Sequence, residues 1–105
     1  MIMAPTNVFA HDFKAGGLYY TITSETESTV DVAPPTEDDP YGTKVSLNHL
    51  YYYGKIEIPE EVEYNSKKYR VTGIEVGTFS GCTAITSVIM PNTIIEIKKR
   101  AFLQL

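Results

Sequence analysis

The stretch VTGIEVGTFSGCTAITSVIMPNTIIEIKKRAF, residues 71–102, contains an internal repeat that decides the fold. Ile74 and Phe79 recur as Ile97 and Phe102, and the shift is the same for both pairs (97 − 74 = 102 − 79 = 23). Self-similarity at a fixed period of this size is typical of proteins built from stacked repeats. The sequence therefore predicts that residues 74–102 form successive layers of one architecture.

A second alignment extends the repeat toward the N-terminus. IEIPEEV, residues 56–62, matches VIMPNTI, residues 88–94, under a larger shift (88 − 56 = 32). The difference between the two shifts (32 − 23 = 9) corresponds to an insertion, which we place between Val62 and Ile74. Within this insertion, Asn65 and Ser66 indicate the tight turn of a β-hairpin.

Each repeat is expected to contain one short strand that alternates into the core. Residues 87–90 form that strand, and Pro91 ends it because proline cannot donate to a strand ladder. Ile94 and Ile97 should then turn inward, and a tight turn places Phe79 on its layer. Such a unit buries only one side by itself and needs neighbours above and below.

The residues before the repeat are rich in predicted strands. GLYYTITSETESTVDVA, residues 17–33, alternates on both sides of a polar turn, as expected for a hairpin. Proline and acidic residues in PPTEDDPYGT, residues 34–43, indicate a loop. No window carries a long helical period, so we expect a mainly β fold.

The repeat resembles the BspA-type leucine-rich repeat, whose pattern is roughly I-G-x-x-A-F-x-x-C-x-x-L-x-x-I-x-I-P-x-x-V-x-x-I-G-x-x-A-F. The resemblance implies a hairpin-rich N-terminal cap that leads into a short leucine-rich-repeat solenoid. It also implies an inward repeat core, made of Ile74, Phe79, Cys82, Ile85, Val88, Met90, Pro91, Ile94, Ile97 and Phe102. Ala101 also agrees with the pattern, whereas Glu75 and Lys98 replace its glycine and Thr78 replaces its alanine.

The resemblance divides the chain into three parts. Residues 1–10 are expected to be either the remnant of an export signal or a disordered N-terminus. Residues 11–73 form the β-rich cap, which includes the first repeat strand. Residues 74–105 hold one complete and one truncated repeat. Because no successor layer follows Phe102, we expect either that another chain covers this end, for example by self-association of the uncapped C-terminal repeat, or that the fragment is only marginally stable.

Val8, Phe9 and Ala10, followed by His11, have the form of a signal-peptidase site, although the basic leader and most of the apolar segment are missing. An ordinary terminus that happens to contain this pattern is the competing interpretation. The resemblance implies a secreted or cell-surface bacterial protein, which agrees with the first interpretation.

Composition argues against several classes of function. The net charge is −4 over 105 residues, which disfavours nucleic acid and anionic lipid as partners. No apolar run is long enough to span a membrane. Cys82, the one cysteine, has no histidine at an informative spacing, and a buried cysteine behaves as a small hydrophobe. We therefore expect no enzyme, no metal and no cofactor; the acidic run at residues 37–39 lacks the spaced ligands of a calcium loop.

Tyrosines are the candidates for ligand contact. The chain has 8 of them, and LYYYG at residues 50–54 places Tyr51 and Tyr53 on one face of a strand. Tyrosine is favoured at recognition surfaces, although packing in the sheet core is the alternative role. The resemblance implies a non-enzymatic exported repeat protein that binds another protein, in adhesion or host interaction. A carbohydrate-binding accessory module that uses the tyrosine face is the second hypothesis.

Overall fold

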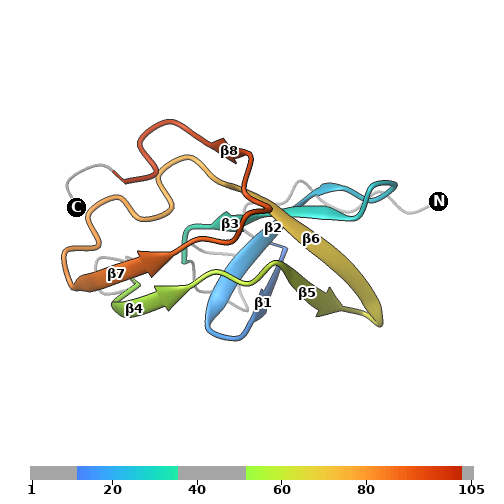
Figure 1. Cartoon of the computed structure of the whole chain (residues 1–105), viewed down its shortest axis with the longest axis horizontal. Helices are drawn as coiled ribbons and strands as arrows, with labels where there is room; N and C mark the ends of the chain where they lie inside the picture. The colour runs from blue at the N-terminus through green and yellow to red at the C-terminus, as the bar shows by residue number, and fades with distance from the viewer. Residues whose placement is uncertain (1–11, 36–51, 103–105) are drawn as a thin grey trace, which may run out of the picture.

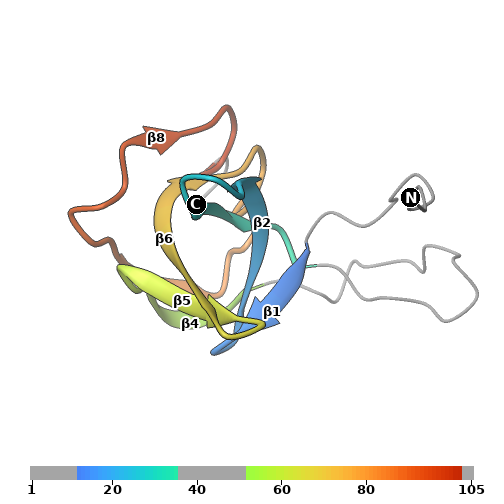
Figure 2. The ribbon, with the colours of Figure 1, turned by 90° about the vertical axis from the view of Figure 1, so that its right-hand side faces the viewer.

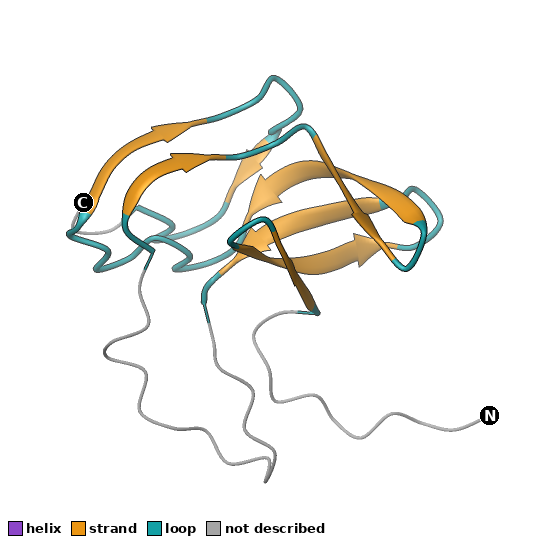
Figure 3. Ribbon diagram, turned by 90° about the horizontal axis from the view of Figure 1, so that it is seen from below, coloured by secondary structure: helices purple, strands orange, loops and turns teal. Residues whose placement is uncertain are grey.

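A computed structural model describes residues 12–35 and 52–102 of the chain (Figure 1). In this part of the chain the fold is mainly β, and its regular elements are strands (Figure 3). In chain order they are β1 (Phe13–Ala15), β2 (Leu18–Ser24), β3 (Thr29–Ala33), β4 (Gly54–Glu57), β5 (Glu61–Tyr64), β6 (Lys67–Ile74), β7 (Ile85–Ile89) and β8 (Glu96–Ile97).

Most strands join one sheet, in the order β1-β2-β3-β6-β5, and β8 also pairs with β6. Both predicted hairpins are present: β2 pairs antiparallel with β3, and β5 pairs antiparallel with β6. Asn65 and Ser66 connect β5 to β6 with φ angles of 53° and 62°. Two residues with positive φ fit the tight hairpin turn whose twist matches that of the strands.

This sheet curls until its two ends meet. The ring of Phe13 on β1 stacks on the ring of Tyr64 on β5, with centroids 4.3 Å apart and planes within 5°. Figure 2 shows β1 and β5 close together at the lower side of the molecule. Tyr20 and Tyr69 also lie within ring-contact distance of Phe13. The aromatic side chains therefore close the sheet around a core.

The repeated segments lie beside one another in the registers that the sequence alignments predict. β4 and β7 form a second, two-stranded parallel sheet in which Ile56 pairs with Val88, as in the second alignment. β6 and β8 pair in parallel with Ile74 opposite Ile97, as in the first. The difference between the two alignments corresponds to the β5–β6 hairpin, so the insertion leaves the stacking intact.

The turns between these strands also stack. The Phe79 N–H donates to the Ala101 carbonyl oxygen at 2.8 Å, and the Phe79 and Phe102 rings lie 5.2 Å apart. The core runs without interruption from the hairpins into the repeat; its buried members are Phe13, Leu18, Tyr20, Val30, Val32, Tyr52, Ile56, Ile58, Tyr69, Val71, Ile74, Phe79, Cys82 and Ala101.

Two residues predicted to face inward are exposed. Met90 is 39% exposed because the strand ends at Ile89, one residue earlier than expected, and alternation no longer orients its side chain. Ile97 is 49% exposed, since β8 contains only two residues and packs through its backbone onto β6. The strand itself begins at Ile85, two residues before the predicted start.

The other predicted repeat-core residues lie in or against the core. Ile74, Phe79 and Cys82 are buried, and Pro91 is half-buried. Ile85, Val88, Ile94 and Phe102 are partly buried and pack against the core cluster.

Candidate functional site

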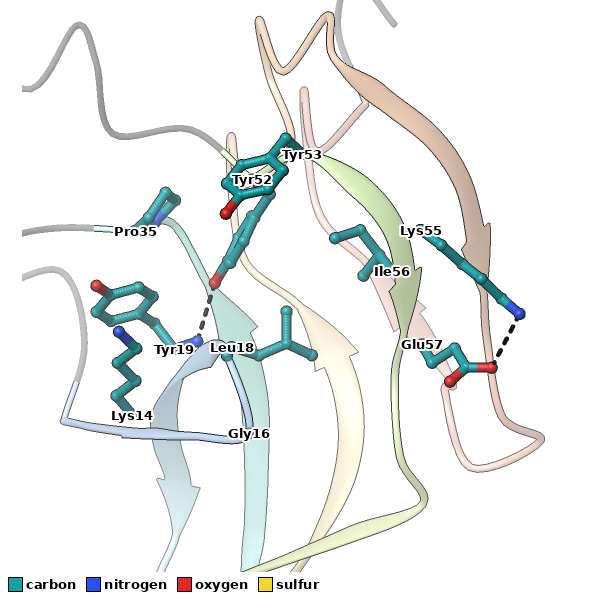
Figure 4. A pocket seen from close by; sticks show the side chains of 11 residues that line it. Lys14, Gly16, Leu18, Tyr19, Pro35, Tyr52, Tyr53, Lys55, Ile56 and Glu57 are labelled. Atoms are coloured by element: carbon teal, nitrogen blue, oxygen red, sulfur yellow. Dashed lines mark hydrogen bonds and ion pairs between the residues drawn. The ribbon is translucent and has the colours of Figure 1, made fainter.

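The candidate site is a groove beside β4 (Figure 4). A cavity of about 400 Å³ lies between β4 and the β1–β2 turn, a volume within the range of ligand pockets. A second cavity of about 310 Å³ shares Gly16, Leu18 and Glu57 with the first and continues to Val62 and Glu63 on β5. We call the two together the β4 groove. The rest of its lining is Lys14, Ala15, Gly17, Tyr19, Tyr20, Pro35, Tyr52, Tyr53, Lys55, Ile56 and Pro59.

A glycine turn forms one wall of the groove. Ala15 pairs with Leu18, so Gly16 and Gly17 make a two-residue hairpin loop, and their φ angles are 57° and 87°. Positive φ at both positions is the reason for glycine there. A side chain added at either glycine would point into open space, so the turn presents bare backbone to the groove.

Tyr52 fixes the opposite wall. Its hydroxyl donates to the Ala33 carbonyl oxygen at 2.7 Å. The same hydroxyl accepts from the Tyr19 N–H at 2.9 Å (Figure 4). Burial raises the pKa of Tyr52, so the hydroxyl keeps its proton for the first of these bonds. The ring also contacts Phe79 with a centroid separation of 5.3 Å. One side chain thus connects the entry to β4 with the β2–β3 hairpin and with the repeat core.

Of the two tyrosines predicted to contact a ligand, Tyr53 lies within the described residues. It is 76% exposed at the rim of the groove, because successive residues of an extended chain point to opposite sides and Tyr52 takes the inner one. Tyr51, its predicted companion, lies outside the described residues. Sequence reasoning missed the contribution of Lys14; the paired glycines at 16 and 17 were the available signal for a turn there.

Charges are distributed unevenly along the groove. The Lys14 ammonium lies 5.2 Å from the centroid of the Tyr19 ring, a cation–π arrangement. Lys55 pairs with Glu57 at 3.4 Å. No carboxylate among the described lining residues of the first cavity is left to neutralise Lys14, and the second cavity adds the exposed Glu63. The groove is therefore cationic near Tyr19 and acidic near β5.

The groove follows an edge of β4 that no described strand pairs with. β4 pairs with β7 on one edge, where the N–H groups of Gly54 and Ile58 donate to Ala84 and Ile89 at 3.0 Å each. Backbone groups alternate between the two edges of a strand. Those of Lys55 and Glu57 consequently face away from β7, and both residues line the groove. In the described part of the chain no strand pairs with this edge.

Cys82 has the environment of a packing residue. It is 1% exposed, burial raises the pKa of its thiol, and its sulfur lies 4.0 Å from the Thr78 carbonyl oxygen. The two histidines of the chain, His11 and His49, and the acidic run at residues 37–39 lie outside the described residues. Within the described ranges no group of three potential metal ligands gathers, and no helix is long and apolar enough to cross a membrane.

The residues that depart from the repeat pattern form an ion-pair cluster. Lys98 Nζ lies 3.0 Å from Asp31 Oδ2 and 3.9 Å from Glu75 Oε1. Asp31 is buried on β3, and no other donor in the described part of the chain reaches its Oδ2 atom. A Cβ at Gly73 would lie against the Asp31 carboxylate, so glycine is required beside it. The cluster joins the cap strand to the last repeat.

Large apolar side chains remain exposed between Ile89 and Ile97. Ile89 is 48% exposed and Ile95 is 84% exposed. Together with Met90 and Ile97 they form what we call the C-terminal apolar set. β7, which carries Ile89, pairs only with β4 among the described strands, so its other edge is open there.

Parallel pairing of repeated strands and stacking of repeated turns define a leucine-rich-repeat type of fold. The comparison with solved structures agrees: a leucine-rich repeat protein from Bacteroides ovatus ATCC 8483 matches 88% of this chain, with 28% sequence identity and a TM-score of 0.66. This chain spans 21% of the length of that protein. Neither the protein-family models nor the curated proteins contain a match.

Proposed function

We propose that this chain is an exported, non-enzymatic repeat module of the BspA type that binds another protein. Support comes from the pattern agreement along residues 74–102, from the stacked registers of β4–β7 and β6–β8, and from the leucine-rich-repeat neighbour. Leucine-rich repeats commonly present surfaces for protein contact. On this proposal the repeats form a short solenoid that follows the hairpin cap.

The main observation in favour of protein binding is the exposure of the C-terminal apolar set. Ile89, Met90, Ile95 and Ile97 are all more than one-third exposed on the outermost described layer. Exposed apolar groups beside an open strand edge mark a surface that another protein covers. The covering partner is expected to contribute a strand to β7 and apolar side chains over Ile89. The chain itself offers such a strand, so a second copy serves as the probe.

Sedimentation of the chain over a range of concentrations tests this proposal. We expect a monomer–dimer equilibrium that the Ile89→Ser variant weakens by about tenfold, the effect of losing roughly 1.4 kcal/mol of apolar contact. Val76→Ser is the matched control, because Val76 is exposed but lies before the stacked turns rather than on the outermost layer. A particle that stays monomeric at every concentration, with the β7 amides protected from exchange, would contradict the docking role.

The location of the protein is tested separately. Export is supported by the signal-peptidase pattern at Val8, Phe9 and Ala10. N-terminal sequencing of the protein from the producing cell should then start at His11, and the protein should be found outside the cytoplasm. An adhesion role predicts binding of the purified chain to extracellular host proteins, undiminished in a Cys82→Ala variant. An intact N-terminus in the cytoplasmic fraction would refute export.

A further inference from the structure

We propose that the β4 groove binds an extended peptide segment of a partner protein, which adds as a strand to the free edge of β4. This inference rests on the proposed protein-binding function and assigns it a second surface. Strand addition obtains affinity from main-chain hydrogen bonds and specificity from the side chains beside the edge. The groove supplies both of these features.

The main-chain partners are the N–H and C=O groups of Lys55 and Glu57. They face away from β7, because the intervening ladder uses Gly54 and Ile58 on the other edge. Lys55 and Glu57 are exposed, whereas Ile56 between them is buried. The buried Ile56 side chain holds β4 in place. Because this edge is therefore ordered before a peptide binds, pairing with it costs little conformational entropy.

The dimensions of the groove fit one extended chain. Its two cavities share Gly16, Leu18 and Glu57, so they follow β4 from Tyr53 to Pro59. Along this length an extended peptide of about six residues would span roughly 20 Å. The bare backbone of Gly16 and Gly17 forms the far wall, which leaves space for a strand between that turn and β4.

Charge determines which peptide fits best. The Lys14 end is cationic and the Glu63 end is acidic. A peptide with an acidic residue near Lys14 and a basic residue near Glu63 complements both ends. Tyr53, exposed at the first end, and Leu18, buried below the groove, offer apolar contact to residues between them. The charges at the two ends of the groove therefore determine which peptide binds, and hydrogen bonds to the β4 backbone provide the affinity.

Amide exchange and peptide titration test the proposal together. The probes are the hexapeptide DVTVTK, its uncharged analogue NVTVTQ and the proline analogue DVTPTK, which lacks a ladder donor. In the free protein the Lys55 and Glu57 amides should exchange fast. DVTVTK should shift and protect these two amides, NVTVTQ should bind more weakly, and DVTPTK should bind at least about tenfold more weakly.

Variants separate strand addition from other binding. Glu57→Pro removes a donor from the free edge while the β4–β7 ladder stays intact, so it should abolish peptide binding. Lys14→Gln should weaken DVTVTK severalfold, whereas Lys68→Gln, an exposed lysine outside the groove, should not. If Glu57→Pro does not fold, the proline peptide gives the same test on the native chain.

Three results would overturn the inference. Slow exchange of Lys55 and Glu57 in the free protein would show that the edge is already paired. Equal binding of DVTVTK and DVTPTK would exclude a strand ladder. A larger response to trigalacturonic acid than to any peptide, lost in Tyr53→Ala, would assign the groove to a sugar. None of these results affects the sedimentation test, which reports on the β7 edge.

Discussion

Replacing Lys98 by methionine should destabilise the protein far more than an ordinary surface substitution. The change keeps most of the side-chain stem and removes the ammonium 3.0 Å from Asp31 Oδ2. Asp31 then remains buried with its charge uncompensated. Breaking a fully buried ion pair by removing one partner costs about 3–5 kcal/mol.

The exposure of the two partners sets the magnitude and its asymmetry. The Lys98 side chain is 31% exposed and that of Asp31 only 4%. Water therefore reaches the pair from the lysine side, and we expect Lys98→Met to cost about 2–3 kcal/mol. Asp31→Asn should cost less, about 1 kcal/mol, because the released lysine can turn to water and to Glu75. This difference between the two substitutions is expected for an ion pair in which only the lysine reaches solvent.

Urea unfolding followed by tyrosine fluorescence measures both variants. A loss of about 2–3 kcal/mol lowers the midpoint by about 1–2 M for a small domain. Lys68→Met is the matched control: Lys68 lies 3.8 Å from Glu61, both side chains are more than half exposed, and its midpoint should not move. Equal midpoints for Lys98→Met and Lys68→Met would refute the reasoning.

Three further predictions address the thiol, the turn and alkaline stability. Cys82 should react with a thiol reagent only at the rate of unfolding, since it is 1% exposed; fast labelling of native protein would contradict its role in packing. Ser66→Gly should stabilise the protein by about 0.5–1 kcal/mol in the same urea assay, because φ there is 62°; destabilisation would argue against this turn. Burial raises the pKa of Tyr20 to about 12 and that of Tyr52 also above its usual value of 10.0. Well below pH 10 both stay protonated in either state, so their contribution to stability is constant there; it falls as the pH rises through 10, where the unfolded tyrosines ionise first. Absorbance at an alkaline pH should therefore show their ionisation together with the loss of circular dichroism, and ionisation before unfolding would count against it.

The repeat registers could be predicted because the information is local and periodic. Ile56 and Val88, like Ile74 and Ile97, are aligned by sequence alone, and they are the residues that pair. The β5–β6 hairpin could also be predicted from the sequence, because Asn65 and Ser66 favour a tight turn and lie within a few residues of both strands. The fold class could therefore be predicted from patterns of residues that lie close together in the sequence.

Contacts between distant segments could not be predicted in the same way. Asp31 meets Lys98 only because β3 pairs in parallel with β6, and nothing near either residue encodes that pairing. The stacking of Phe13 on Tyr64 depends on the curl of a whole sheet. For the same reason the sequence indicated an exposed tyrosine at Tyr53 but not the groove, which needs the β1–β2 turn to lie beside β4.

The glycine turn beside β4 has a consequence for how copies of this chain can assemble. A two-stranded parallel sheet with both edges open would allow β7 of one copy to join β4 of the next, and head-to-tail contacts of that kind extend into filaments. Here the turn at Gly16 and Gly17 lines the same groove as β4, so we expect it to obstruct the edge of a second folded sheet more than a single extended chain. Within the β4–β7 sheet, as far as the structure describes the chain, the edge of β7 then remains for pairing with a second copy. Pairing of β7 with β7 uses the same edge on both partners, so we expect this contact to close at two copies.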